Sequence, residues 1–131
     1  MAIYGIGANY DGVGSVLEEF QTKGLACIGW LPEEAPTLHK ILEQIDIGDI
    51  IFIKSYPPSD GLIIKLVGIT IDDQILEDNS LGRGIKVKWV WEGKEELGKI
   101  DDKYNVRMNT IYQEHNSMIL KRVIELLLSK I

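Results

Sequence analysis

The chain contains 131 residues, of which 45% are hydrophobic and 26% charged, and its formal net charge at pH 7 is −6. The apolar content excludes an intrinsically disordered chain, and the length predicts one domain, residues 1–131, that folds without a disulfide or a metal. Non-specific binding to duplex nucleic acid rests on contacts between cations and phosphates. The acidic balance disfavours that class of partner, although it leaves room for a local basic patch.

Cysteine content and the beginning of the chain bear on the cellular compartment. Cys27 is the only cysteine, which excludes an internal disulfide and a cysteine-rich zinc site. The segment MAIYGIGANYDG has neither the basic region nor the long apolar region of a secretory signal. No apolar run reaches the roughly 18 residues that cross a bilayer. We therefore expect no membrane segment and a cytoplasmic location, in the host cytoplasm if the source is a virus.

The first half of the chain alternates between predicted strands and helices. Met1–Ala8 is a predicted strand, and Ser15 with Glu18 has the spacing of a capping box that begins a helix. Gly24 is the expected left-handed cap at the end of that helix. The next predicted elements are a strand at Leu25–Trp30, a helix at Thr37–Ile45, and strands at Ile50–Tyr56 and Leu62–Ile71.

The second half is predicted to contain a loop, one or two strands and a long helix. Asp72–Gly84 is interpreted as a loop, Tyr104–Met108 as a short strand, and the polar stretch between residues 92 and 102 has no clear period. Alternation predicts a strand at Ile85–Trp91, with Ile85, Val87, Trp89 and Trp91 on one face and Lys86, Lys88 and Val90 on the other. Asn116 is the expected N-cap of a helix at Ser117–Ile131, whose apolar stripe is Leu120, Val123, Ile124, Leu127, Leu128 and Ile131.

This order of elements, β-α-β-α-β-β-β-(β)-α, indicates an α+β fold class. The hairpin-like connections and the alternating fifth strand favour a mixed, mostly antiparallel sheet. The spacing between helices and strands is too irregular for a repeated βαβ pattern. We expect about three helices to pack on this sheet.

Residues at the ends of predicted strands are candidates for binding a ligand. Trp30 closes an apolar strand, where its ring could stack on a base, or it could be a tryptophan at the rim of the core. Asn9 offers a donor and an acceptor to a base edge, and Tyr10 can stack or donate a hydrogen bond to a phosphate. The alternative for both residues is that they only fill a turn.

A second group of candidates lies farther along the chain. Lys54, Ser55 and Tyr56 supply a charge, a hydroxyl and a ring, which suits a phosphate and a base; the alternative is an ordinary solvated strand end. Arg107, with Asn109 and Thr110 nearby in the sequence, could clamp a phosphate or a base edge, or could form an ion pair at the surface.

No residue pattern points to catalysis or to a metal. The glycines near the beginning of the chain lack the remaining residues of a phosphate loop, and His39 and His115 are isolated. Cys27 has apolar neighbours and is interpreted as a buried small residue rather than a nucleophile. We expect no metal, no cofactor and no enzymatic activity.

Several segments together resemble the PUA-like superfamily, and above all its EVE-like domains, such as the modules of Mrr- and McrBC-like restriction systems. The similar segments are Gly5–Tyr10, Gly24–Trp30, Ile47–Tyr56 and Leu62–Ile71, followed by WVW at 89–91 and by Tyr104–Arg107 with Thr110. The resemblance covers most of the chain. It implies a small twisted β-barrel with packed helices and a concave site that holds a nucleobase, often a modified one, between aromatic side chains.

The resemblance and the residues together predict a non-catalytic module that binds a nucleotide or a modified nucleobase. The expected ligand-binding residues are Asn9, Tyr10, Trp30, Lys54, Ser55, Tyr56, Arg107 and Thr110. A virus-encoded sponge that sequesters a nucleotide immune signal is one form of this hypothesis, and it predicts a homodimer or a larger assembly. The alternative is a protein-interaction or regulatory subunit of a restriction or toxin system, without a small ligand.

Overall fold

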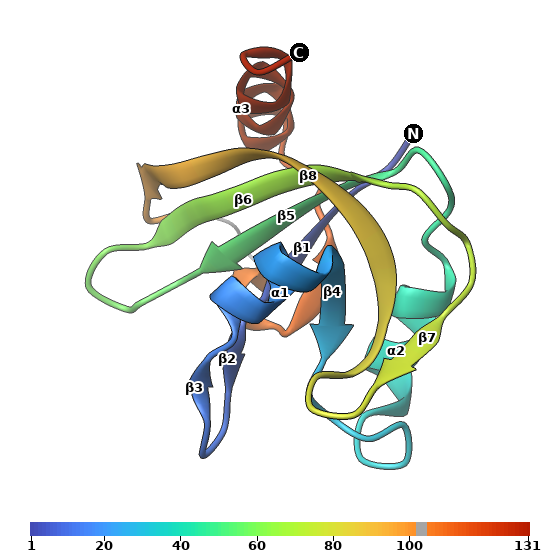
Figure 1. Ribbon diagram of the computed structural model, residues 1–131. Coiled ribbons are helices and arrows are strands. Elements are labelled where there is room, and N and C mark those ends of the chain that lie inside the picture. Colours follow the sequence, from blue (N-terminus) through green and yellow to red (C-terminus); the bar gives the residue numbers. More distant parts are fainter. Residues whose placement is uncertain (102–104) are drawn as a thin grey trace.

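The computed structural model describes residues 1–101 and 105–131. Its elements are β1 (Ile3–Gly7), β2 (Asn9–Tyr10), β3 (Gly14–Ser15), α1 (Leu17–Lys23), β4 (Leu25–Ile28), α2 (Pro36–Glu43), β5 (Ile50–Ser55), β6 (Leu62–Thr70), β7 (Leu76–Asp78), β8 (Gly82–Gly98), a 3₁₀ helix (Val106–Met108), β9 (Ile111–Gln113) and α3 (Ser117–Leu128). Figure 1 shows their arrangement. Within residues 1–101 and 105–131, none of the helices combines the length and the hydrophobicity of a membrane span.

One mixed sheet organises the fold. Its strands follow the order β4-β8-β6-β5-β1-β9, and β7 pairs with the first part of β8 on the side opposite β4. Among the strand pairs of the described residues, only β1 and β5 are parallel. The intervening chain, with α1, β4 and α2, provides the crossover that a parallel pair requires. The predicted α+β class with a mostly antiparallel sheet is therefore confirmed.

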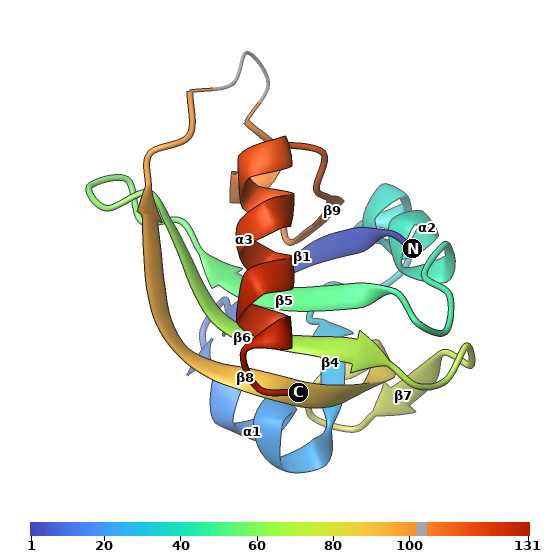
Figure 2. The same ribbon diagram turned by 90° about the horizontal axis from the view of Figure 1, so that it is seen from above.

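The sheet curls into a half-barrel because β8 is long and strongly bent. This strand has 17 residues; its first part pairs with β4 and β7, and the rest pairs with β6. The register between β6 and β8 shifts at three points, and such irregularities increase the local twist of a sheet. Figure 2 shows the resulting curve of β8 from above.

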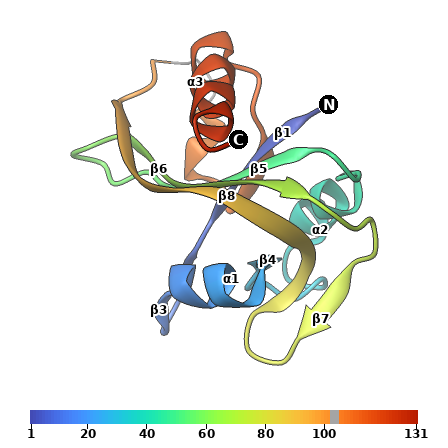
Figure 3. The same ribbon diagram turned by 45° about the horizontal axis from the view of Figure 1, so that its top comes forward.

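Two hydrophobic cores lie on the two sides of the curled sheet. The inner core contains Phe20 of α1 and Leu42 of α2 together with β4, and the outer core contains Phe52 together with Ile119 and Val123 of α3. Figure 3 shows α3 across the outer face, with α1 and α2 on the opposite side. Each amphipathic helix thus buries its apolar face against one side of the sheet, which is the main source of helix stability in proteins.

Two of the three predicted helix caps agree with the observed ends of the helices. Gly24 ends α1 with φ 65°, and Asn116 caps α3 by accepting hydrogen bonds from the amides of Met118 (3.0 Å) and Ile119 (3.2 Å). Both predictions are confirmed. The predicted capping box is wrong: Ser15 belongs to β3, and its hydroxyl accepts a hydrogen bond from the Leu17 amide instead.

The segments whose sequence shows no clear helical or strand periodicity contain more secondary structure than predicted. The expected loop at Asp72–Gly84 contains β7 and the beginning of β8, and β8 continues through the polar stretch as far as Gly98. The strand expected at Tyr104–Met108 is wrong in its described part, where Val106–Met108 forms a 3₁₀ helix. Tyr104 lies outside the described residues.

A register shift also overturns the predicted grouping of two tryptophans. Val67 of β6 faces Trp91, whereas the next residue, Gly68, faces Trp89, so that Val90 has no counterpart. Trp89 therefore packs on the inner core and Trp91 on the outer core. The prediction of a shared face is wrong for Trp91, because a bulge inserts one residue and reverses the side from there on.

The predicted apolar stripe of the last helix is partly corrected as well. Val123 and Leu127 are buried against the sheet as expected, whereas Leu128 and Ile131 are exposed. Ile119 and Leu126, which the predicted stripe omits, are buried instead. The helix presents its apolar face to this protein's own sheet, so that face is not free to form a subunit interface.

Candidate functional site

Two adjoining cavities open at one edge of the sheet. The first, here called the lysine cavity, has a volume of about 400 Å³ and is lined by Gly7, Ala8, Asn9, Lys54, Ser55, Tyr56, Pro57, Met108, Asn109 and Thr110. The second, the tryptophan cavity, has a volume of about 350 Å³ and is lined by Asn9, Tyr10, Asp11, Val13, Gly29, Trp30, Ser80 and Thr110. Asn9 and Thr110 belong to both, so the cavities meet at these two residues. Each volume is in the range of sites for small ligands.

Strand directions explain why distant segments meet here. Gly7 of β1 lies opposite Lys54 in the parallel neighbour β5, so the carboxyl ends of both strands reach the same edge. β9 is antiparallel to β1 and begins at this edge, where the Gly7 amide donates a hydrogen bond to the Thr110 carbonyl (2.8 Å). One parallel pair and one antiparallel pair therefore bring three segments of the chain together.

Seven of the eight predicted ligand-binding residues line these cavities: Asn9, Tyr10, Trp30, Lys54, Ser55, Tyr56 and Thr110. They come from β2, the loop after β4, the end of β5 and the segment before β9. Arg107 is the exception. The fold therefore brings seven of the candidates together. Which of their polar groups and rings are available to a ligand depends on the contacts that each side chain already makes within the protein.

Trp30 is a half-exposed aromatic wall that is held in place. Trp30 is 43% exposed. The indole Nε1 donates a hydrogen bond to the Thr110 hydroxyl (3.2 Å). The Trp30 carbonyl lies 2.7 Å from Nε2 of buried His39, and Nδ1 of His39 lies 2.9 Å from Nη1 of Arg83. Because a carbonyl only accepts and a guanidinium only donates, His39 carries its proton on Nε2. His39 and Arg83 thus fix the backbone that carries the ring.

Tyr10 contributes a ring but not a free hydroxyl. The ring meets Phe20 edge to face, with 6.3 Å between centroids, and its hydroxyl donates a hydrogen bond to the Leu81 carbonyl (2.7 Å). Burial raises the pKa of Tyr10, so the phenol stays protonated. The predicted hydrogen bond from this hydroxyl to a phosphate therefore does not fit, whereas the ring remains a wall of the tryptophan cavity.

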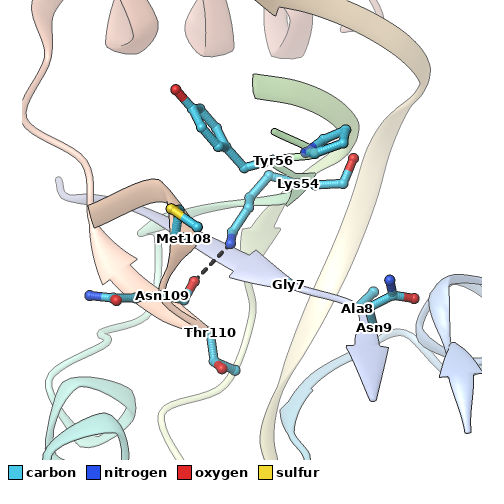
Figure 4. A pocket seen from close by; sticks show the side chains of 10 residues that line it. Gly7, Ala8, Asn9, Lys54, Tyr56, Met108, Asn109 and Thr110 are labelled. Carbon is cyan, nitrogen blue, oxygen red and sulfur yellow. Dashed lines mark hydrogen bonds between the residues drawn. The ribbon is translucent and has the colours of Figure 1, made fainter. Parts of the chain in front are cut away.

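Lys54 is a buried cation that forms part of the lysine cavity. The residue is 7% exposed, and its Nζ donates hydrogen bonds to the carbonyls of Arg107 and Asn109, both at 2.7 Å. Figure 4 shows Lys54 reaching toward Asn109 between Met108 and Gly7. The ammonium also lies 5.5 Å from the centre of the Tyr112 ring. Burial lowers the pKa of Lys54 to about 8, because an apolar surrounding disfavours its charged form.

The remaining predicted residues divide into a tethered one and two with free polar groups. The Tyr56 hydroxyl accepts hydrogen bonds from the Ile100 amide (3.0 Å) and the Asn105 side chain (2.9 Å), so only its ring faces the cavity. Within the described ranges, the side chains of Asn9 and Ser55 have no hydrogen bond to the protein. Their amide and hydroxyl are therefore available to a ligand.

Arg107 is corrected by the structure. Its side chain is 3% exposed and pairs with the fully buried carboxylate of Glu114, with Nε 3.1 Å from Oε1 and Nη2 close to Oε2. Glu114 also accepts hydrogen bonds from the amides of His115 and Asn116. The ion-pair alternative holds, although the pair is buried rather than at the surface. The guanidinium does not reach the cavities, so it is not a clamp for a ligand there.

Sequence reasoning missed several residues that shape the site. Met108 lines the lysine cavity, and His39 with Arg83 positions Trp30. Asn109, noted in the sequence only as a neighbour of Arg107, lines the lysine cavity as well. In the described ranges, no cluster of three or more His, Cys, Asp or Glu side chains could hold a metal.

Cys27 is buried in β4, as its apolar neighbours in the sequence predict. Burial raises the pKa of its thiol to about 12, so the thiol stays protonated at neutral pH. The interpretation of Cys27 as a packing residue is therefore confirmed.

The lowered pKa of the buried Lys54 predicts that the stability of the protein depends on pH in an unusual way. The pKa of Lys54 falls from 10.5 to about 8 on folding, so the unfolded chain binds more protons between these two values. The Lys54 contribution to the free energy of unfolding should therefore rise with pH across this window, by up to about 1.4 kcal/mol per pH unit. Urea denaturation of the wild type and of Lys54→Met from pH 7.5 to 10.5 isolates this contribution, because tyrosines titrate in both proteins. Parallel curves would contradict the prediction.

Comparison with known proteins leaves the site to be interpreted from its own geometry. No protein-family model matches the chain, and no curated protein matches its sequence.

Proposed function

We propose that the chain is a nucleotide-binding module that holds a nucleobase in the tryptophan cavity and acts by binding rather than by catalysis. The observation that carries this proposal is the junction of the two cavities at Asn9 and Thr110, which joins an exposed aromatic ring to a buried cation. Aromatic rings stack on bases, and cations bind phosphates, so the two cavities suit the two ends of one nucleotide.

Polar groups at the junction support a nucleobase rather than a purely apolar ligand. The Asn9 amide offers both a donor and an acceptor, which matches the edge of a base. Ser80 adds a hydroxyl to the tryptophan cavity. Trp30 is held by Thr110 and by the buried His39, so it need not be ordered when a base stacks on it. A preorganised wall of this kind lowers the entropic cost of binding.

The proposal includes a place for the chain among the PUA-like, EVE-like domains. A half-barrel formed by a curled mixed sheet with three helices is compatible with the small barrel of those domains. The tryptophan cavity lies beside this half-barrel, where the resemblance implies a base between aromatic side chains. Tyr10 and Trp30 supply the two rings.

Substitution of Trp30 tests base stacking directly. Trp30→Ala should weaken the binding of a nucleotide about 5- to 150-fold, because stacking on an aromatic ring contributes about 1–3 kcal/mol per base. The ligand is first found by thermal shift with nucleosides, nucleotides, cyclic nucleotides, ADP-ribose isomers and short modified oligonucleotides. Ligand at about 100 times its dissociation constant should raise the melting temperature by several degrees. Isothermal titration calorimetry then gives the affinities.

Two further variants control this test. Trp30→Phe keeps a ring and should retain most of the affinity, and Leu31→Ala removes a neighbouring exposed side chain that lines neither cavity. Unchanged affinity in Trp30→Ala would overturn the assignment of the base to this cavity. If no nucleotide shifts the melting temperature, the protein-interaction hypothesis gains and the proposed function fails.

The same titration separates two forms of the proposed function. A sponge for a free nucleotide signal must bind more tightly than the receptor with which it competes, and binding should not need a polymer. A module that recognises a modified base should respond only to the oligonucleotides. A stoichiometry of one ligand per two chains would support the homodimer that the sponge hypothesis predicts.

A further inference from the structure

The Lys54 ammonium has hydrogen-bonding capacity that the protein does not use. An ammonium carries three N–H donors, and two of them reach the carbonyls of Arg107 and Asn109. Within residues 1–101 and 105–131, no carboxylate lies within ion-pair distance of Nζ. A buried charge without an opposite charge is costly, so this arrangement favours an anion that comes from outside the chain.

Gly7 keeps the ammonium open to the lysine cavity. A Cβ atom at this position would lie 3.7 Å from Lys54 Nζ and 3.9 Å from Cε. Any longer side chain on Gly7 would therefore cover the charged end of Lys54. Gly7 itself lines the cavity and pairs directly with Lys54 across β1 and β5. Because Gly7 has no side chain, the space next to the ammonium on this side stays open.

The charges around the lysine cavity also favour an anion. The protein has 20 acidic and 14 basic residues, yet none of the described residues that line this cavity is acidic. Three titratable residues contact Lys54 or share a cavity with it. They are Arg107, whose guanidinium pairs with Glu114, Lys65, which lines a small side cavity together with Lys54, and Tyr112, whose ring lies near the ammonium. None of these groups places a negative charge next to the ammonium.

We infer that the lysine cavity is the phosphate subsite of the proposed nucleotide site, and that Lys54 binds the phosphate by a charge-assisted hydrogen bond. The inference rests on the proposed function and gives the ligand a direction, with the base against Trp30 and the phosphate against Lys54. The two ends fit one molecule because the cavities meet at Asn9 and Thr110. Ser55 also lines the lysine cavity, and its free hydroxyl adds a donor there.

Binding through this group should be linked to a proton. Burial lowers the pKa of Lys54 to about 8, and a bound phosphate favours the charged form again. At pH 8 a nucleotide should therefore bind with uptake of up to about half a proton. Its affinity should fall as the pH rises above 8. Calorimetry in two buffers with different heats of ionisation measures this uptake.

Comparison of a nucleoside with its 5′-monophosphate tests the subsite. The base is the one that gives the largest thermal shift. In the wild type the monophosphate should bind about 10- to 100-fold more tightly, since a hydrogen bond to a charged group contributes that much. In Lys54→Met the ratio should fall to about one. The matched control is Lys86→Met, which removes the same charge from an exposed position on β8. It should keep the wild-type ratio.

A second variant keeps the lysine and closes its approach. Gly7→Ala adds a methyl group at ordinary van der Waals distance from Nζ, so the protein should fold, and the preference for the monophosphate should shrink. Equal binding of nucleoside and monophosphate to the wild type, or an unchanged ratio in Lys54→Met, would overturn the inference while the proposed function stands.

Inorganic phosphate separates the inference from the proposed function. If it raises the melting temperature of the wild type but not of Lys54→Met, the subsite is supported even where no nucleoside binds. If neither phosphate nor any nucleotide has an effect, both proposals fail.

Discussion

Replacement of Arg107 by methionine is expected to lower the free energy of unfolding by about 3–5 kcal/mol, since it removes one partner of a buried ion pair. The Glu114 side chain that remains is fully buried. It would keep its hydrogen bonds from the amides of His115 and Asn116 but would lose its cation. Urea denaturation, with the midpoint and slope compared between variant and wild type, measures the loss.

Two controls distinguish the ion pair from simple loss of packing. Arg107→Met combined with Glu114→Gln removes both charges and leaves an acceptor for the two amides, so most of the lost stability should return. Arg122→Met breaks the more exposed pair with Glu95 and should cost much less. A double variant that is as unstable as Arg107→Met would show that the charges are not the cause.

Gly84→Ala should destabilise the protein by about 3 kcal/mol, the upper end of what overpacking in a core costs. Gly84 of β8 lies directly opposite Cys27 of β4. An added Cβ would overlap the Ala26 carbonyl oxygen and the Cys27 sulfur, and would lie 2.7 Å from Cys27 Cα. Two of these three atoms are backbone, so the strands themselves would have to separate.

The same substitution at Gly7 is the matched control for Gly84. There the atoms nearest to the new Cβ belong to Lys54 and the Thr110 carbonyl, at 3.7–3.9 Å. Gly7→Ala should therefore unfold at nearly the same urea concentration as the wild type. Equal stability of the two variants would show that β4 and β8 can separate at little cost. Because β4 leads directly into the loop with Trp30, Gly84→Ala should also weaken ligand binding.

Residues with a local role were predicted correctly from the sequence. Gly24 ends α1 and Asn116 caps α3, because each requirement is met within a few residues of chain. The apolar strands β1, β4, β5 and β6 were also located, since runs of β-branched and aromatic residues favour extended chain wherever they are buried. The predicted capping box at Ser15 failed because pairing with Asn9 places that serine in a strand.

Elements that depend on a distant partner were predicted less well. The polar end of β8 has no period of its own and is a strand because β6 lies beside it. Trp91 lies on the opposite side from Trp89 because of a bulge that only the pairing with β6 defines. In both cases the hydrogen bonds that decide the structure come from another part of the chain.

The residues of the candidate site also divide into those that the sequence located correctly and those that it did not. The types of Asn9, Trp30 and Lys54, together with their positions at strand ends, were enough to select them as candidates, because such positions lie at the edge of a sheet. Arg107 was misplaced, since its partner Glu114 is brought beside it by the turn into β9. Residue type alone does not tell a buried ion pair from a free cation.

Local spacing and burial preference act within a few residues, so the helices, most strands and the side chains with useful chemistry can be located from the sequence. The folded chain is needed to place Gly7 next to the Lys54 ammonium and to bring the two cavities together at Asn9 and Thr110. These arrangements follow from the parallel pairing of β1 with β5 and from the position of β9. Such contacts join residues far apart in the chain, so their energy exists only once the whole sheet has formed.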